Sequence, residues 1–165
     1  MVHYTQVAIR SKQFGVYVQL NGAGISKLQD SREPYRGTVR TAGHAAGWEI
    51  FNLHHNNDDT VSFEASQFRN VFLCLDGNGV EPGVHTDFAG GSVAAQYGAS
   101  AWEKFHIRRI DEATGTVTIE SAHFPRRYLR VDGNPGVVNV QGVAAGWEQF
   151  EIVVLGYSRV WNSIN

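Results

Sequence analysis

The chain repeats one sequence pattern three times, and this internal repeat limits the possible folds more than any other feature. Each copy ends in the motif Trp-Glu-x-Phe, which begins at Trp48, Trp102 and Trp147. In every copy a valine stands nine residues before the tryptophan, and the copy opens with a valine seven residues before a phenylalanine. Equal spacings in three places predict three like units within a single domain, residues 1–165.

Each unit contains four short runs in which apolar and polar residues alternate, bounded by glycine, asparagine or aspartate. Alternation with a period of two is typical of β-strands, and no long run has the 3.6-residue period of an amphipathic helix. Three units of four strands that close on themselves predict an all-β fold, a β-trefoil with pseudo-threefold symmetry, because propellers usually need at least about four blades. The expected units are about 4–57, 58–113 and 114–155, with a C-terminal tail at 156–165 outside the repeat.

The units differ in the connection between their second and third strands. An Asn-Gly or Asp-Gly pair follows the second strand, which predicts a tight turn with glycine at positive φ. From this glycine to the tryptophan is 26 residues in unit one, 25 in unit two and 14 in unit three. Units one and two therefore carry inserts, at 23–37 and 78–91, whose Gly, Pro and polar residues predict surface loops. The three pairs are Asn21-Gly22, Asp76-Gly77 and Asp132-Gly133.

The net charge and the cysteine content indicate which kinds of binding partner and which cellular compartment to expect. The chain has 14 Lys and Arg against 16 Asp and Glu, a net charge of −2. Nucleic-acid and membrane partners are not expected, since the sequence contains neither a basic run nor an apolar run of 18 residues. Cys74 is the single cysteine, so no intramolecular disulfide can form, and the first residues lack a signal-peptide pattern. We expect a cytoplasmic location, or secretion if a leader has been removed.

The sequence contains no recognisable catalytic or metal-binding motif. The histidines are dispersed, and neither a nucleophile motif nor a phosphate-binding loop occurs. An active site is also rarely needed three times on one small barrel. We therefore expect a binding protein without enzymatic activity, metal or cofactor.

The repeated unit resembles the fascin-like β-trefoils and the related trefoil carbohydrate-binding modules of glucan-degrading enzymes. The resemblance rests on Tyr/Phe-Leu-x-Val/Leu-Asp-Gly followed by Trp-Glu-x-Phe-x-Ile, and it covers Val7 to Val154. Trefoils of this type bind β-glucans, other sugars or actin, so the resemblance implies a binding module and leaves the ligand open.

We interpret the repeated Trp-Glu pair as the candidate ligand site. On a continuous strand Glu49 would face the core with Phe51, whereas Trp48 would face outward. An outward indole suits stacking on the apolar face of a pyranose. Two alternatives stay open: each glutamate is held by loop backbone, like the glutamine of the Gln-x-Trp pattern in ricin-type trefoils, and each tryptophan fills the junction between units. The candidate residues are Trp48, Glu49, Trp102, Glu103, Trp147 and Glu148.

Three function hypotheses follow. The first is a lectin or carbohydrate-binding module that recognises glucose-type polysaccharide, such as a β-glucan, through up to three sites. The site of unit three is expected to be the most open, because the inserts 23–37 and 78–91 would cover or reshape the other two. The second hypothesis is a fascin-like protein that binds actin. The third is a protein-interaction module whose inserts contact a partner, for instance through Tyr35, Arg36 and Phe88.

Overall fold

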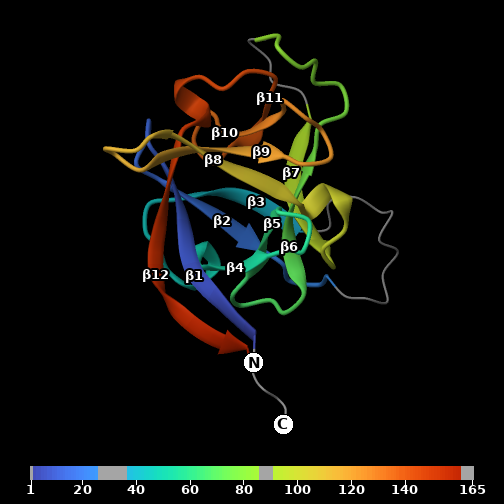
Figure 1. Ribbon diagram of the computed structural model, residues 1–165, viewed down its shortest axis with the longest axis vertical. Helices are drawn as coiled ribbons and strands as arrows, with labels where there is room; N and C mark the ends of the chain where they lie inside the picture. The colour runs from blue at the N-terminus through green and yellow to red at the C-terminus, as the bar shows by residue number, and fades with distance from the viewer. Residues whose placement is uncertain (1, 26–36, 86–90, 161–165) are drawn as a thin grey trace.

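The molecule consists of twelve β-strands and three single-turn 3-10 helices in the computed structural model, which describes residues 2–25, 37–85 and 91–160. Side chains are described for 5–25, 37–85 and 91–156. The strands form three groups of four, and one 3-10 helix precedes the last strand of each group (Figure 1). The fold is a β-trefoil, which confirms the prediction from the repeat.

The elements follow the three repeats in order. Unit one contains β1 (Val2–Ser11), β2 (Tyr17–Asn21), β3 (Gly37–Ala42), the 3-10 helix η1 (Gly47–Glu49) and β4 (Phe51–His55). Unit two contains β5 (Val61–Ala65), β6 (Val71–Asp76), β7 (Ser92–Tyr97), η2 (Ala101–Glu103) and β8 (Phe105–Asp111). Unit three contains β9 (Thr116–Ser121), β10 (Tyr128–Val131), β11 (Val138–Gln141), η3 (Gly146–Glu148) and β12 (Phe150–Val160).

Two kinds of antiparallel pairing recur around the barrel. The second and third strands pair within each unit, as β2–β3, β6–β7 and β10–β11. The fourth strand of each unit pairs with the first strand of the next, as β4–β5, β8–β9 and β12–β1. The last of these pairings joins the first strand to the last strand, and it closes the threefold ring.

The C-terminal tail continues the last strand. The ladder between β1 and β12 runs from Val2 opposite Val160 to Ser11 opposite Phe150, with a register shift after Gln6. Figure 1 shows the two strands side by side. Residues 156–160 of the tail therefore belong to the barrel's closing ribbon, and 161–165 lie outside the described residues.

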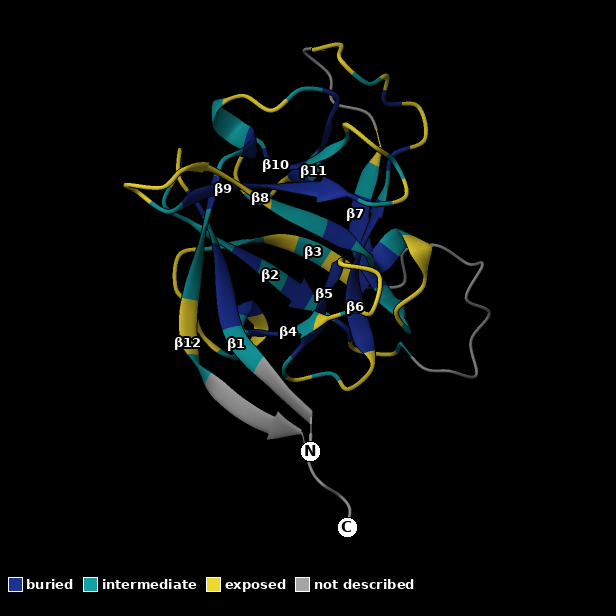
Figure 2. Ribbon diagram, in the orientation of Figure 1, coloured by how far each residue is buried: buried dark blue, intermediate teal, exposed yellow. Residues whose placement is uncertain are grey.

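The core is formed by inward side chains of all three units, whereas exposed residues gather on the loops (Figure 2). Phe51, Phe105 and Phe150 open the fourth strand of their units, and all three are fully buried, as the motif phasing predicts. Phe63 lies between two of these rings, with its centroid 6.1 Å from that of Phe51 and 5.8 Å from that of Phe105. The aromatic rings of units one and two therefore meet in the centre of the core.

The turn chemistry differs from the prediction. Positive φ is found not at the glycine of each Asx-Gly pair but further along each connection, at Gly24, Gly79 and Gly136. The connections are longer than a two-residue hairpin turn, and the Asx side chain shapes them by accepting the backbone N–H two residues on. These three bonds are Ala23 N to Asn21 Oδ1 (3.0 Å), Asn78 N to Asp76 Oδ1 (2.9 Å) and Asn134 N to Asp132 Oδ1 (2.9 Å).

Residues 26–36, which are most of the first insert, and 86–90, which are part of the second, lie outside the described residues, and with them Tyr35, Arg36 and Phe88. Within the described ranges, no helix has the length and apolar character needed to span a membrane.

Candidate functional site

The Trp-Glu pairs lie on the 3-10 helices rather than on strands, so the expectation that Trp and Glu alternate between strand faces is wrong. The reason is local. The glutamate carboxylate folds back onto the backbone N–H three residues earlier and closes a single helical turn, as in a capping box. Glu49 Oε1 accepts from Ala46 N (2.8 Å), Glu103 Oε1 from Ser100 N (2.8 Å) and Glu148 Oε1 from Ala145 N (2.6 Å).

The three glutamates are buried, with 3%, 5% and 2% of their surface exposed in chain order. Each uses its carboxylate to hold the loop before the fourth strand, and each also faces the middle of its unit's second strand. There the residue differs from unit to unit. Gln19 Nε2 donates to Glu49 Oε2 at 2.8 Å, Cys74 donates its S–H to Glu103, and Arg130 Nε lies 3.4 Å from Glu148 Oε2.

Burial raises the pKa of two of these three glutamates. The pKa of Glu103 is raised, because burial penalises the carboxylate more than the Cys74 thiol and the Ser100 amide stabilise it. The pKa of Glu148 is raised for the same reason, although the Ala145 amide and the charge of Arg130 oppose the shift. The same burial raises the pKa of the Cys74 thiol, with Glu103 adding to the effect, so this cysteine stays protonated.

Each tryptophan packs against a phenylalanine of the next unit. The ring centroids are 6.0 Å apart for Trp48 and Phe68, 5.4 Å for Trp102 and Phe124, and 5.4 Å for Trp147 and Phe14. The contacts run from unit one to two, two to three and three back to one, so the indoles lie at the junctions. Trp48 is nevertheless 43% exposed, and the other two are half-buried. Each indole therefore combines a junction contact with a solvent-facing surface.

The glycine of each Asx-Gly pair is required by these junctions. A Cβ on Gly22 would lie 2.9 Å from Cγ of Phe68, and one on Gly77 would lie 2.8 Å from Cγ of Phe124. Real Cβ atoms do not approach ring carbons so closely, and only glycine lets the turn lie on the ring. In unit three a Cβ on Gly133 would instead meet Trp147, 2.9 Å from the end of the indole.

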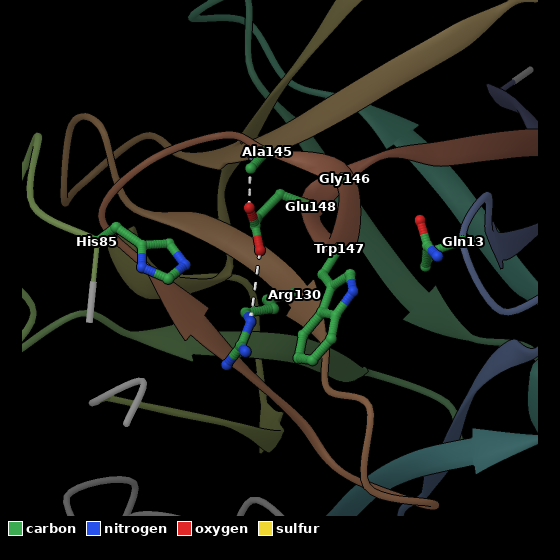
Figure 3. A pocket seen from close by; sticks show the side chains of 7 residues that line it. All are labelled: Gln13, His85, Arg130, Ala145, Gly146, Trp147 and Glu148. Carbon is green, nitrogen blue, oxygen red and sulfur yellow. Dashed lines mark hydrogen bonds and ion pairs between the residues drawn. The ribbon is translucent and has the colours of Figure 1, made fainter. Parts of the chain in front are cut away.

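Unit three carries a pocket of about 400 Å³ beside Trp147 (Figure 3). A volume of this size lies within the range of about 300–1,000 Å³ that is usual for small-ligand sites. The pocket wall combines an indole ring, an amide, an imidazole, a guanidinium and a carboxylate. Its residues are Gln13, His85, Arg130, Ala145, Gly146, Trp147 and Glu148.

This pocket is built from all three units. Gln13 comes from unit one, His85 from the insert of unit two, and the remaining residues from unit three. The sequence predicts that the insert of unit two covers or reshapes the site of unit two, but the described part of this insert packs on unit three. Gly83 N donates to Gly142 O at 2.7 Å, and Arg127 Nε donates to Val80 O at 2.8 Å.

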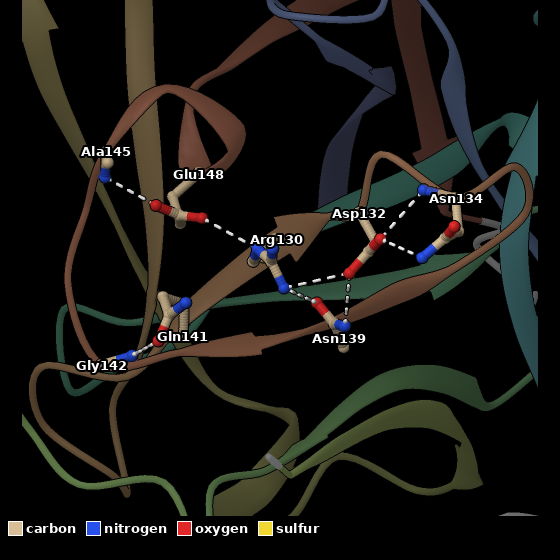
Figure 4. Close-up of polar contacts among 8 residues, drawn as sticks. All are labelled: Arg130, Asp132, Asn134, Asn139, Gln141, Gly142, Ala145 and Glu148. Atoms are coloured by element: carbon tan, nitrogen blue, oxygen red, sulfur yellow. Dashed lines mark hydrogen bonds and ion pairs between the residues drawn. The ribbon is translucent and has the colours of Figure 1, made fainter. Parts of the chain in front are cut away.

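Arg130 is the centre of the polar contacts (Figure 4). Its side chain is 5% exposed, and its Nη1 lies 3.1 Å from Asp132 Oδ2 and 3.4 Å from Asn139 Oδ1. The guanidinium carbon also lies 4.7 Å from the centroid of the Trp147 ring, a cation–π contact. The Asn134 backbone amide, followed by Asn139 and Arg130, outweighs burial and lowers the pKa of Asp132, so the pair carries opposite charges at neutral pH.

Sequence reasoning named Trp147 and Glu148 but missed Arg130, Gln13 and His85. A signal for Arg130 was present, because the position that holds Gln19 in unit one and Cys74 in unit two becomes a cation in unit three. Gln13 and His85 carry no such signal. Among the described residues, no group of three or more His, Cys, Asp or Glu is arranged to hold a metal ion.

The ring of junctions and the three capped 3-10 turns define a β-trefoil whose third unit carries a pocket. A comparison of the sequence with family models and with curated proteins finds no match. Solved structures do match in shape. SeviL bound to the asialo-GM1 saccharide is 11% identical, with a TM-score of 0.64 and coverage of 92% of this chain and 98% of that chain.

Two further structures show the same architecture. The BEL β-trefoil in an apo crystal form is 12% identical, with a TM-score of 0.61 and coverage of 92% of this chain and 93% of that chain. A mosquitocidal holotoxin is 11% identical, with a TM-score of 0.70, and the match covers 94% of this chain but 18% of the toxin chain. At these identities the likeness establishes the fold alone.

Proposed function

We propose that this protein binds carbohydrate and that its principal site is the pocket beside Trp147. The observation that carries the proposal is a partly exposed indole at the wall of a pocket that also presents amide, imidazole, guanidinium and carboxylate groups. Saccharides are recognised by this combination, because a pyranose has apolar C–H faces and a rim of hydroxyls that donate and accept hydrogen bonds. The saccharide-bound SeviL shows that a trefoil of similar shape serves such a function.

The ligand class that we propose is a glucose-type polysaccharide such as a β-glucan. The indole of Trp147 offers its exposed surface to the sugar ring, while the Arg130 guanidinium and the Phe14 ring hold the indole in place. Glu148 fixes the loop and the guanidinium. Equivalent but shallower contacts at Trp48 with Glu49 and at Trp102 with Glu103 are proposed as secondary sites on the same polymer, where repeated weak contacts raise avidity.

The test is isothermal calorimetry with soluble β-1,3- and β-1,6-glucans, beside a glycan array that covers other sugar classes. Trp147→Ala should weaken binding at least tenfold, and Trp48→Ala, the matched change in unit one, should weaken it far less. Affinity should change little with added salt, because stacking and hydroxyl contacts are not screened. An array without any bound glycan, together with co-sedimentation on actin filaments, would refute the proposal and favour the cytoskeletal hypothesis.

A further inference from the structure

The guanidinium of Arg130 has one nitrogen that its neighbours leave unused. Nε faces Glu148 and Nη1 bonds Asp132 and Asn139, but no described residue accepts a hydrogen bond from Nη2. Only 5% of the side-chain surface is exposed, and the side chain lines the pocket. Buried donors are almost always paired, so Nη2 marks the place where an acceptor oxygen of a ligand would lie.

The other two units do not reproduce this arrangement. At the equivalent strand position unit one has Gln19, whose Nε2 is directed at Glu49 Oε2 at 2.8 Å. Unit two has Cys74, which offers only a weak S–H donor to Glu103. Neither residue is a cation, and neither has a further nitrogen to present. The insert of unit two adds His85 to the third site, on the side of the pocket where Figure 3 places Glu148.

The charges around the pocket define which saccharide fits. Arg130 contributes +1, and Asp132 and Glu148 each contribute −1 when ionised, so the cluster has a net charge of −1. Protonation of Glu148 brings it to zero. An acidic sugar would meet the Glu148 carboxylate at the pocket wall and a guanidinium that Glu148 and Asp132 already neutralise. Neutral hydroxyls can accept from Nη2 without that repulsion.

We propose that the protein binds one neutral saccharide unit per chain, in the pocket of unit three, and that Arg130 is the specificity-determining residue. The proposal rests on the carbohydrate-binding function above and makes it narrower. Nη2 donates to a hydroxyl oxygen of the sugar, Trp147 supports the ring, and His85 closes the wall. Units one and two lack this cation, so they hold no short oligosaccharide and add only the weak contacts with a longer polymer that are proposed above.

The test uses the full chain, calorimetry and two matched probes. The first is a neutral β-1,3-glucan hexasaccharide, and the second is the same hexasaccharide with its C6 hydroxyls oxidised to carboxylates. We expect one neutral oligosaccharide per chain and at least tenfold weaker binding of the oxidised form. Arg130→Gln should weaken binding of the neutral probe roughly ten- to a hundredfold, the loss of a charged hydrogen bond.

The variant is chosen so that folding and binding can be separated. Glutamine already stands opposite the buried glutamate in unit one, so Arg130→Gln keeps a donor for Glu148, and urea unfolding checks its stability. Arg108→Gln, at a side chain that is 59% exposed, is the control and should bind as the parent does. If Arg130→Gln fails to fold, His85→Ala on the exposed wall should still weaken binding about two- to tenfold.

The outcomes are distinguishable. Three neutral oligosaccharides per chain, preference for the oxidised probe, or full affinity in folded Arg130→Gln would overturn this inference while the carbohydrate function stands. Where that variant does not fold, full affinity in His85→Ala has the same meaning. Binding of neither probe by the parent, with an empty glycan array, would overturn the carbohydrate function and the inference with it.

Discussion

Replacing Trp102 by alanine tests whether the tryptophans hold the three units together. This indole lies at the junction of units two and three, 5.4 Å from the Phe124 centroid and 6.3 Å from that of His123. The Phe124 ring in turn lies under the turn at Gly77. Trp102→Ala therefore removes a ring that packs between η2 and unit three.

The expected cost follows from the half-buried state of the ring. A buried aromatic side chain hides about 150–250 Å², so a half-buried indole hides roughly 100 Å², or about 2.5 kcal/mol at about 25 cal/mol per Å². The aromatic pair adds about 0.5–1.5 kcal/mol, and partial collapse of the site returns some of the loss. We expect the free energy of unfolding to fall by about 3 kcal/mol. For Trp48→Ala we expect a somewhat smaller loss, since Trp48 is 43% exposed and its ring centroid lies farther from its phenylalanine, at 6.0 Å against 5.4 Å.

The assay is urea unfolding followed by far-UV circular dichroism, with Trp102→Phe as the control that keeps an aromatic ring. A two-state transition with an unchanged slope lets the change in midpoint be converted into free energy. A loss below about 1 kcal/mol for Trp102→Ala would show that the indole is dispensable to the junction. The tryptophans would then be explained by ligand contact alone.

Three further predictions concern the core, the buried acids and the turns. Phe105→Ala should cost about 3–5 kcal/mol in the same assay, because the fully buried ring leaves a cavity; a loss under 1 kcal/mol would contradict the packing. Burial raises the pKa of Glu103 above its ordinary 4.5, so the folded state binds more protons than the unfolded state. The stability that protonated Glu103 contributes is therefore complete below about pH 4.5 and is lost as the pH rises through the raised pKa. The difference in the free energy of unfolding, Glu103→Gln minus parent, should therefore increase from pH 4 to pH 7. A difference that stays constant over this range would argue against the raised pKa. Gly77→Ala should cost about 1–3 kcal/mol through its clash, whereas Gly43→Ala, with open space around its Cβ, should be neutral; equal effects would disprove the close approach.

The fold could be predicted from the sequence because its determinants are local and threefold. Alternation of period two specifies strands, and the equal valine and tryptophan spacings specify three units that must close on each other. Phe105 could be assigned to the core for the same reason. The strand-face argument failed at Trp48 and Glu49, because a single capped turn interrupts the period of two, and such a turn depends on one side-chain hydrogen bond.

The sequence by itself determined the trefoil, its aromatic core and the positions of the repeated Trp-Glu pairs. Only the tertiary structure revealed the pocket of unit three, because its wall brings Gln13, His85 and Arg130 together from three different units. Such residues carry no common spacing, and their proximity comes from barrel closure and from an insert that packs on the neighbouring unit. The repeat makes three equivalent frames, and contacts between distant segments make one of them different.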